Sequence, residues 1–460
     1  MRRLLFVSFL VIMAISLVAC GGQTAAPTEA PAVEPTQEAE VEATEAPAQE
    51  GAAIYLMGAD GLLSDTHFEN IGEDGVGTFY SGPALPSGDA YADFVAKYEA
   101  AYGEAPIQAF HGHAYDSATM LLTAIDQAAE EQDDGSLIIS RQAVIEALYQ
   151  MTQDGLTGTH RCNEFGDCAA PRIGIYRFTD ASQTASDVLG NSVTIAEFEP
   201  PEAGVGVVPE PPAGVELGEV TVAEGAPIEV ATLQAISGAV ANLGTDQVRA
   251  VELAITDYGE IAGHPVQLSM SEDDQCNAEG GQLGAQRIVA NPQVIGVVGT
   301  SCSGAAVPAS EVLSAAGYAL ISGSNTSPGL TATGYLSEEG PSRGENWSYG
   351  YFRIAHNDEF QGRGAASFAY NDLGVSQAAT INDGDPYTQG LTSAFGASFE
   401  EFGGDIVLAT AVGKEQEDMR PVLTEVAASG AQLVYFPIFE PAGNFIVLQA
   451  PEVGLEIQRP

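Results

Sequence analysis

The chain has 460 residues, of which 45% are hydrophobic, so it is long enough to form two or three globular domains with buried cores. Its formal net charge is -48, with 63 acidic residues against 15 lysines and arginines, and its only lysines are Lys97 and Lys414. This balance excludes nucleic acid and a polybasic membrane-binding surface as default partners. Solubility explains the acidity most simply, and the acidity identifies no ligand.

Residues 1–20 have the three parts of an export signal. MRRLL supplies positive charge, FVSFLVIMAISL is an apolar core too short to span a membrane comfortably, and LVAC ends in Cys20. The LVAC ending resembles a bacterial lipobox, in which the cysteine carries lipid; an ordinary secretion signal with a chance cysteine is the alternative. Residues 21–51 contain almost no large apolar side chains, which predicts a disordered acidic tether.

The cysteines indicate an oxidising compartment. If Cys20 carries lipid, an even number remains: Cys162, Cys168, Cys276 and Cys302. Cys162 and Cys168 flank the turn-rich segment NEFGD, which predicts one disulfide and leaves the other two cysteines to form the second. A zinc site built from His160, Cys162 and Cys168 is the alternative, but structural zinc takes a fourth ligand that this segment does not supply.

Beyond the tether, short apolar runs alternate with longer amphipathic stretches, as in PIEVATLQAI followed by GTDQVRAVELAITDYG. This alternation predicts βα units and parallel sheets. Ligands on such sheets bind beyond the carboxyl ends of the strands. The stretch 199–227 is rich in Pro, Gly and Glu, as is typical of a linker, and it divides the chain into blocks 52–198 and 228–460.

Both blocks contain segments of one family. The second block contains EDDQCNAEGG, GVVGTSCSGAAVPAS, LISGSNTSPGLT and DGDPYTQGL, and the first contains LMGADGLLSD, YADFVAKYEAAYGEAP and HAYDSATMLLTAI. By these segments the chain resembles the leucine/isoleucine/valine-type substrate-binding proteins of ABC importers over nearly everything after residue 52. The resemblance implies the type I periplasmic binding fold, an α/β fold with two lobes, each a mostly parallel sheet flanked by helices.

The two blocks stand in the reverse of the family's usual order. Joining the final APEVGLEIQRP to AAIYLMGADGL restores a familiar helix-to-strand passage. We interpret this order as a circular permutation in which residues 199–227 join the family's usual termini, which is tolerable where termini lie close together at the surface. A tandem gene that lost its outer halves and a sequence assembly error are the alternatives. Carried over from the family, lobe one would comprise 80–152 and 228–352, and lobe two 52–79, 153–198 and 353–460.

The resemblance implies a cleft for a zwitterionic amino acid, which needs donors for its carboxylate and acceptors for its ammonium group. Ser303 matches the family's ligand-contacting serine, and Cys302 and Cys276 match the disulfide beside it. Ser324 and Thr326, in ISGSNTSP, match a second set of ligand contacts. Backbone N–H groups at a helix N-terminus would also serve the carboxylate.

On the other lobe, Asp60 in MGADG matches an acidic partner of the ammonium group, with a turn residue in a D-G dipeptide as the alternative. Phe439 falls at or next to an aromatic residue that covers the ligand, or else is a core aromatic residue. Tyr387 in DPYTQG either lines the cleft or lies in an exposed loop. Leu243, beside Asn242, stands where the family has an aromatic residue, so the side-chain pocket departs from the family's pattern.

Motifs of catalysis do not support an enzyme. GTSCSG has serine at position 303, where the nucleophile elbow G-x-S-x-G needs glycine, and the predicted disulfide removes the thiol of Cys302. The histidines show no H-E-x-x-H spacing, and the sequence has no G-x-x-x-x-G-K-[ST] phosphate loop. We therefore predict a protein without catalytic residues, cofactor or metal.

We expect an extracytoplasmic receptor, anchored in the cell envelope through Cys20, that binds an amino acid of the branched-chain type or a similar small polar solute. Its partners would be the membrane permease and ATPase subunits of an ABC importer; it would bind no nucleic acid and would be a monomer. A receptor of the same fold for amides or organic acids, acting with a signalling partner, is one alternative. A surface hydrolase using Ser303 or Ser301 is the other.

Overall fold

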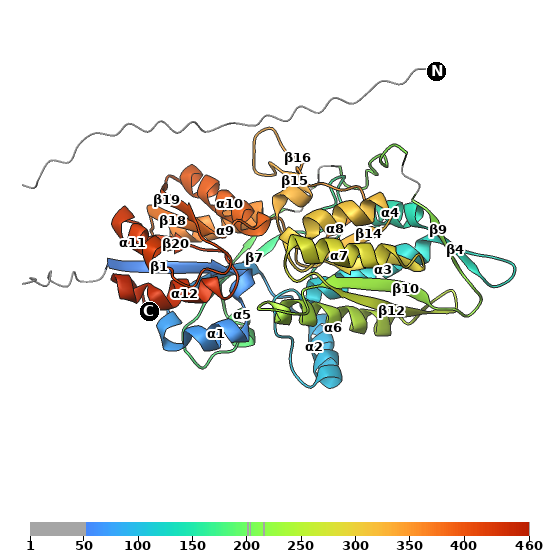
Figure 1. Ribbon diagram of the computed structural model, residues 1–460, viewed down its shortest axis with the longest axis horizontal. Coiled ribbons are helices and arrows are strands. Elements are labelled where there is room, and N and C mark those ends of the chain that lie inside the picture. The colour runs from blue at the N-terminus through green and yellow to red at the C-terminus, as the bar shows by residue number, and fades with distance from the viewer. Residues whose placement is uncertain (1–51, 200–201, 203, 215–216, 460) are drawn as a thin grey trace, which may run out of the picture. The chain divides into compact units, whose positions relative to one another are not determined.

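The computed structural model describes residues 52–199, 202, 204–214 and 217–459. The predicted signal peptide of residues 1–20, the lipidation site Cys20 and the predicted tether of residues 21–51 lie outside the described residues. Two helix-flanked sheets are present, and we call them, with their helices, lobe one and lobe two (Figure 1). Within the described ranges, no helix combines the length and the apolar character needed to cross a membrane.

Lobe one is built on a six-stranded sheet with the order β11-β12-β10-β13-β14-β17. Neighbouring strands are parallel except for β11 and β12. On β13 the successive residues Val297 and Val298 enter different apolar clusters, as expected for a strand buried on both faces. The strands are β10 (Ile228–Gln234), β11 (Glu260–Ile261), β12 (His264–Asp273), β13 (Val294–Gly299), β14 (Ala319–Ser322) and β17 (Tyr351–Arg353).

Helices cover both faces of this sheet (Figure 1). The face of Val297 packs against α7 and α8, and the face of Val298 packs against α3, α4 and α6. The helices of lobe one are α2 (Asp89–Tyr102), α3 (His111–Ala128), α4 (Arg141–Gln150), α6 (Ala241–Tyr258), α7 (Ala278–Val289) and α8 (Ser303–Ala315). Three short sheets are also present in the described structure. One has three strands, β3 (Ala129–Glu131), β4 (Leu137–Ser140) and β9 (Glu219–Val222). The other two are the pair β5 (Gln153–Asp154) and β6 (Thr159–His160) and the pair β15 (Ala332–Thr333) and β16 (Ser342–Arg343).

Lobe two is built on an eight-stranded sheet with the order β19-β18-β20-β1-β2-β7-β8, and β21 also pairs with β1. The pairs from β19 to β2 are parallel, whereas β7 and β8 are antiparallel. The strands are β1 (Ala52–Ala59), β2 (Phe79–Pro83), β7 (Arg172–Arg177), β8 (Ser192–Glu197), β18 (Gln377–Asn382), β19 (Asp405–Ala411), β20 (Leu433–Tyr435) and β21 (Leu455–Ile457).

The helices of lobe two also lie on both faces of its sheet. On β1, Leu56 packs in the cluster that contains α1, α11 and α12, and Met57 packs in the cluster that contains α9 and α10. The bounds are α1 (Asp65–Ile71), α5 (Ala185–Leu189), α9 (Asp358–Ser367), α10 (Pro386–Phe402), α11 (Arg420–Ser429) and α12 (Ala442–Gln449). The predicted fold class, two mostly parallel sheets flanked by helices, is confirmed.

At two places the chain passes from one lobe to the other at different residues from those predicted. β2 pairs with β1 and runs to Pro83, so lobe two extends beyond residue 79. Cys162 and Cys168 lie in the core of lobe one, so the beginning of the segment 153–198 packs on that lobe. Strand pairing and core packing decide where a chain changes lobes, and neither leaves a change in composition at these points.

The predicted linker, residues 199–227, contains a strand of lobe one. β9 pairs antiparallel with β4, and its residues Val220 and Val222 are buried together with Leu217. In EVTV exposed and buried residues alternate, as in a half-buried strand, but the surrounding proline and glycine residues dominate the composition.

At the other end of the chain, β21 pairs in parallel with β1, with Leu455 opposite Ala52. The segments that the permutation hypothesis joins therefore lie side by side in the sheet of lobe two. The permuted order itself stays a prediction.

Both predicted disulfides are present, Cys162–Cys168 and Cys276–Cys302. The first follows β6, and the second joins the loop after β12 to Cys302, which directly precedes α8. His160 is also engaged, because its Nε2 lies 3.0 Å from Asp116 Oδ2. The alternative of a zinc site at His160, Cys162 and Cys168 is wrong, since the two thiolates that it requires are joined to each other.

The buried face of β9 can be tested by substitution. Val220→Asp places a carboxylate in the core of lobe one and should lower the free energy of unfolding by about 2–4 kcal/mol. Thr221→Asp, on the exposed face of the same strand, should change it by less than about 0.5 kcal/mol. Chemical denaturation followed by circular dichroism measures both variants, and equal effects would contradict the packing of this strand on lobe one.

Candidate functional site

Most of the predicted ligand-binding residues lie where parallel strands end. Ligands of parallel sheets bind at this edge because the carboxyl ends of all the strands meet there. The residues are Ser303 after β13, Ser324 and Thr326 after β14, Asp60 after β1, Tyr387 after β18 and Phe439 after β20. Lobe one thus contributes hydroxyl groups, and lobe two contributes a carboxylate and two aromatic rings.

In lobe one, the serine and threonine hydroxyl groups are buried. Ser324 Oγ donates to Ser301 O at 2.9 Å, and Ser303 Oγ accepts from Ser327 N at 3.3 Å. Thr326 Oγ1 is also buried and has no hydrogen-bond partner among the described residues. Ser324 is therefore engaged within its own lobe, whereas the Thr326 hydroxyl is close enough to the Asp358 carboxyl group to lower its pKa.

In lobe two, the structure brings Asp60, Tyr387 and Phe439 together. Tyr387 is buried, its hydroxyl donates to Asp60 Oδ1 at 3.1 Å, and its ring lies 5.2 Å from the ring of Phe439. A Cβ atom at Gly61 would lie 2.8 Å from Phe439 Cδ1, so the Phe439 ring covers the backbone beside Asp60. The alternative that Tyr387 lies in an exposed loop is wrong.

Leu243 has different surroundings. It lies near the beginning of α6, is buried, and belongs to the apolar cluster that contains Phe110 and Leu63. The neighbouring Asn242 Nδ2 donates to Thr66 Oγ1 at 3.3 Å, a contact between the two lobes. Leu243 thus contributes apolar surface and lies outside the polar group around Asp60.

Sequence analysis missed two polar residues of α9, Asp358 and Gln361. Gln361 Nε2 donates to Asp60 Oδ1 at 2.6 Å, and Gln361 Oε1 forms a hydrogen bond with His356 Nε2. Asp358 N donates to Thr326 O at 2.9 Å. Both carboxylate oxygens of Asp358 are buried and have no hydrogen bond of good geometry among the described residues, although the nearby Thr326 hydroxyl lowers the pKa of this carboxyl group. Their only sequence signal was their place after β17, a strand too short to stand out by its apolar pattern.

The two carboxyl groups of this site are hard to ionise in the ligand-free protein. Burial raises the pKa of Asp60 to about 6, despite the hydrogen bonds from Gln361 and Tyr387 that oppose the increase. Burial also raises the pKa of Asp358 well above its usual range, and the negative charge of Asp60 raises it further. No lysine or arginine forms a salt bridge with either group among the residues that the structure describes.

The loop before Ser303 is fixed from two sides. The Cys276–Cys302 disulfide joins the residue before Ser303 to the loop after β12. In the same place, the carboxylate of Asp274 accepts from Cys276 N and from Ser301 N, each at 2.7 Å. Burial raises the pKa of this carboxyl group to about 7, so its backbone partners are the contacts that stabilise its charge.

A cavity of about 790 Å³ lies between the segment that follows β14 and helix α10. Ser327 and Pro386 line it, and Ser327 Oγ donates to Pro386 O at 3.2 Å. None of the predicted ligand-binding residues lines this cavity. We therefore distinguish the cavity from the candidate site, which is the buried polar group around Asp60 and Asp358.

This arrangement suits a small solute with charges at both ends. The unpaired carboxylates of Asp60 and Asp358 complement a cationic group. Ser303 stands at the N-terminus of α8, where the helix dipole and backbone N–H groups favour an anion.

Comparison with known proteins assigns the chain to a family. The profile of the family described as periplasmic binding protein matches residues 43–167 and 227–459. The chain therefore belongs to the periplasmic binding protein family, and the predicted resemblance is confirmed. The members of this family are extracytoplasmic substrate-binding proteins.

Among curated relatives, an "Amino acid binding protein" of Pseudomonas aeruginosa is 33% identical over 222 residues, which are 48% of this chain and 56% of the relative. A "Leu/Ile/Val-binding protein" of Escherichia coli is 26% identical over 234 residues, 50% of this chain and 60% of the relative. The chain thus spans 56% and 60% of the lengths of these two relatives.

Among solved structures, a leucine binding protein of Thermotoga maritima is 18% identical, with a TM-score of 0.44, over 50% of this chain and 61% of that chain. A branched-chain amino acid transporter substrate binding protein of Streptococcus pneumoniae, solved with isoleucine, is 23% identical, with a TM-score of 0.43, over 51% of this chain and 63% of that chain.

The raised pKa of Asp60 predicts a pH-dependent stability. The folded protein holds this proton more tightly than the unfolded chain, so ionisation of Asp60 lowers the free energy of unfolding as the pH rises from about 4 to about 6. Asp60→Asn keeps an acceptor for Gln361 and Tyr387 but cannot ionise. We expect the ligand-free variant to be more stable than the wild type above pH 6, by about 1–3 kcal/mol, and to match it near pH 4.

Chemical denaturation at pH 4, 5, 6 and 7.5 measures this difference. Asp93→Asn, at an exposed position of α2, is the matched control and should change the stability by less than about 0.5 kcal/mol at each pH. A constant difference between the wild type and Asp60→Asn over this pH range would contradict the raised pKa.

Proposed function

We propose that this protein is the solute-binding receptor of an ABC importer and that it holds an amino acid, of the branched-chain type or similar, between its two lobes. The observation that carries the proposal is the pair of buried carboxylates, Asp60 and Asp358, without a cationic partner among the described residues. Such groups are costly unless a ligand supplies the opposite charge.

Each end of an amino acid has a suitable partner in the proposed site. The ammonium group would bind between Asp60 and Asp358, and Gln361 and Tyr387 keep Asp60 in place. The carboxylate would bind at the N-terminus of α8, beside Ser303. Thr326 Oγ1, buried and unpartnered among the described residues, would donate to the carboxylate or accept from the ammonium group.

The apolar surface of the proposed site favours an amino acid with a hydrophobic side chain. Phe439 and Tyr387 supply aromatic surface next to Asp60, whereas Leu243 lies in a neighbouring apolar cluster. The names of the curated relatives, a Leu/Ile/Val-binding protein and an amino acid binding protein, support the same class of ligand.

The proposed role includes the cell envelope and a separate permease. Lipid at Cys20 would anchor the protein, and residues 21–51 would act as a tether to the membrane surface. The receptor, a monomer, would bind and release its solute without covalent chemistry, and ATP would be hydrolysed by another subunit of the importer.

Calorimetry on the purified protein tests the ligand. L-Leucine, L-isoleucine and L-valine are compared with 4-methylpentanoate, which lacks the ammonium group of leucine, and with 3-methylbutylamine, which lacks the carboxylate. We expect an amino acid to bind and both truncated compounds to bind at least tenfold more weakly, because each leaves buried polar groups of the protein unpaired. Asp60→Asn and Asp358→Asn should each weaken amino acid binding at least tenfold. If none of these amino acids binds, or if both variants bind as the wild type does, the proposal fails.

Two close contacts between the lobes support closure around the ligand. On α8 of lobe one, Gly304 faces Asp385, the residue that precedes α10 in lobe two, and a Cβ atom at position 304 would overlap Asp385 Oδ2. On α10, a Cβ atom at Gly390 would lie 2.8 Å from Pro328 Cδ of lobe one. Asp385 is held in place because its Oδ2 also accepts from Lys414 Nζ at 2.6 Å. The two lobes approach this closely only because the facing residues are glycines.

Gly390→Ala and Gly304→Ala should therefore oppose closure without damaging either lobe. We expect the dissociation constant for the ligand to rise at least tenfold, because the added methyl groups prevent the close approach of the two lobes, while the circular dichroism spectrum of each variant stays that of the wild type. The matched control is Gly396→Ala on α10, where a Cβ atom meets only Ile406 Cγ1 at 3.6 Å. Unchanged ligand affinity in both Gly390→Ala and Gly304→Ala would contradict this closed arrangement.

A further inference from the structure

Arg353, the last residue of β17, is completely buried and forms an ion pair with Asp167. Its Nε donates to Asp167 Oδ1 at 2.5 Å. The two residues also form a backbone bridge, in which Arg353 N donates to Gly166 O at 3.0 Å and Cys168 N donates to Arg353 O at 3.1 Å. The contact between these distant parts of the sequence thus involves both side chain and backbone.

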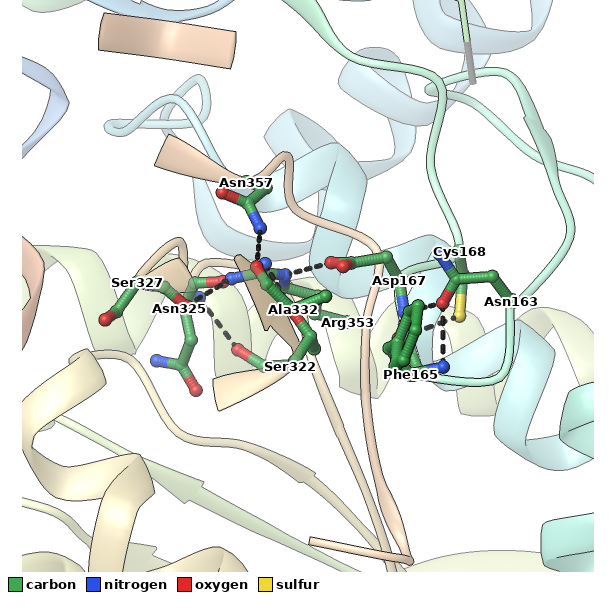
Figure 2. A network of polar contacts seen from close by, with 12 residues as sticks. Asn163, Phe165, Asp167, Cys168, Ser322, Asn325, Ser327, Ala332, Arg353 and Asn357 are labelled. Carbon is green, nitrogen blue, oxygen red and sulfur yellow. Dashed lines mark hydrogen bonds and ion pairs between the residues drawn. The ribbon is translucent and has the colours of Figure 1, made fainter. Parts of the chain in front are cut away.

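The other N–H groups of Arg353 point at the loop that carries the predicted ligand-binding residues (Figure 2). Arg353 Nη1 donates to Ser327 O at 2.8 Å and to Asn325 O at 3.3 Å, the residues on either side of Thr326. Its Nη2 donates to Thr331 Oγ1 at 2.5 Å. We call residues 324–331 the ligand loop. A planar guanidinium with several fixed donors can hold such a loop in one shape, because each donor direction is set by the others.

Asp167 is itself held by a small closed loop. The Cys162–Cys168 disulfide joins residues with a sequence separation of 6, and Asp167 lies directly before the second cysteine. Inside this loop, Asn163 Oδ1 accepts from Asp167 N at 3.1 Å. Tyr335 Oη donates to Asp167 Oδ2 at 2.5 Å and accepts from Asn163 Nδ2 at 2.8 Å, so Asp167 has both carboxylate oxygens engaged.

We propose that the disulfide-closed loop of residues 162–168 supports the ligand site from a distance, with Asp167 and Arg353 as positioning residues for the ligand loop. The loop of residues 162–168 fixes Asp167, Asp167 fixes the guanidinium of Arg353, and Arg353 fixes the carbonyl groups of Asn325 and Ser327. Thr326 lies between these two carbonyl groups, so its hydroxyl keeps its direction only while Arg353 keeps its own. This inference rests on the proposed function, because it takes the ligand loop to contact the solute.

If the Cys162–Cys168 disulfide had a purely structural role, its removal would give a different result. If the disulfide only stabilised the core of lobe one, its loss would loosen that lobe as a whole. If it acts through Arg353, its loss loosens the ligand loop first, while the strands and helices of lobe one keep their protection. Hydrogen exchange separates the two cases, because it reports the opening of each segment by itself.

The experiment compares the wild type with Cys162→Ala/Cys168→Ala and with the milder Tyr335→Phe, which removes one hydrogen bond to Asp167. Hydrogen exchange in the ligand-free protein is followed by mass spectrometry for residues 324–331 and for α8, and calorimetry gives the dissociation constant for the amino acid that binds the wild type. We expect exchange of residues 324–331 to accelerate at least tenfold in the double variant and less in Tyr335→Phe, with α8 unchanged. The dissociation constant should rise about tenfold in the double variant.

Tyr370→Phe in lobe two is the matched control and should leave exchange and affinity unchanged. Unaltered exchange of residues 324–331 in the double variant, or equal acceleration throughout lobe one, would overturn the inference. Wild-type affinity in a double variant with a loosened ligand loop would overturn it as well. If no amino acid binds the wild type, the proposed function fails, and the exchange data still decide whether the disulfide-closed loop supports residues 324–331.

Discussion

A completely buried positive charge, Arg353, lies where the chain leaves the last strand of the sheet of lobe one. A guanidinium in such a place is tolerated only if its charge is balanced and its N–H groups are bonded. Asp167 balances the charge, and the carbonyl groups of Ser327 and Asn325 together with the hydroxyl of Thr331 accept from the remaining groups. These partners belong to segments far apart in the sequence, so one side chain fixes the disulfide-closed loop, the end of β17 and the ligand loop relative to one another.

Unlike Arg353, the buried carboxyl groups of the candidate site form no salt bridge among the described residues. Asp60 has only neutral hydrogen-bond partners, Gln361 and Tyr387, and the carboxylate oxygens of Asp358 have none among the described residues. Burial raises the pKa of both carboxyl groups because their polar neighbours replace only part of the lost hydration of their charges. Under the proposed function, protons and the ammonium group of the ligand would therefore compete for the same two groups. The protein keeps a site that is unfavourable when empty, and the free energy of ligand binding has to include the cost of ionising it.

The sequence was sufficient to predict the fold and to place several candidate residues at the carboxyl ends of strands. Apolar runs followed by Ser, Thr and Asp marked the carboxyl ends of β1, β13 and β14, because a parallel sheet places its polar residues there. Asp358 and Gln361 escaped notice because β17 is too short to show a pattern, and Arg353 because only the folded chain brings Asp167 beside it. β9 was hidden among prolines and glycines, since four alternating residues are a weaker signal than the composition around them. Contacts between distant segments decide these features, and local patterns do not contain them.

The scarcity of positive charge near the candidate site would decide which end of a zwitterionic ligand binds where. The negative charges of Asp60 and Asp385 raise the pKa of Asp358, and the positive charge of Arg353 lowers it. Of these three aspartates, only Asp385 forms a salt bridge among the described residues, with Lys414. The completely buried Arg353 is already paired with Asp167. An amino acid would bring the missing positive charge to the carboxylates, whereas its own carboxylate needs no cation at the N-terminus of α8, where the helix dipole and hydroxyl groups suffice. Formal charges at one end and dipoles at the other would thus orient a zwitterion between the lobes, in a chain with a formal net charge of -48.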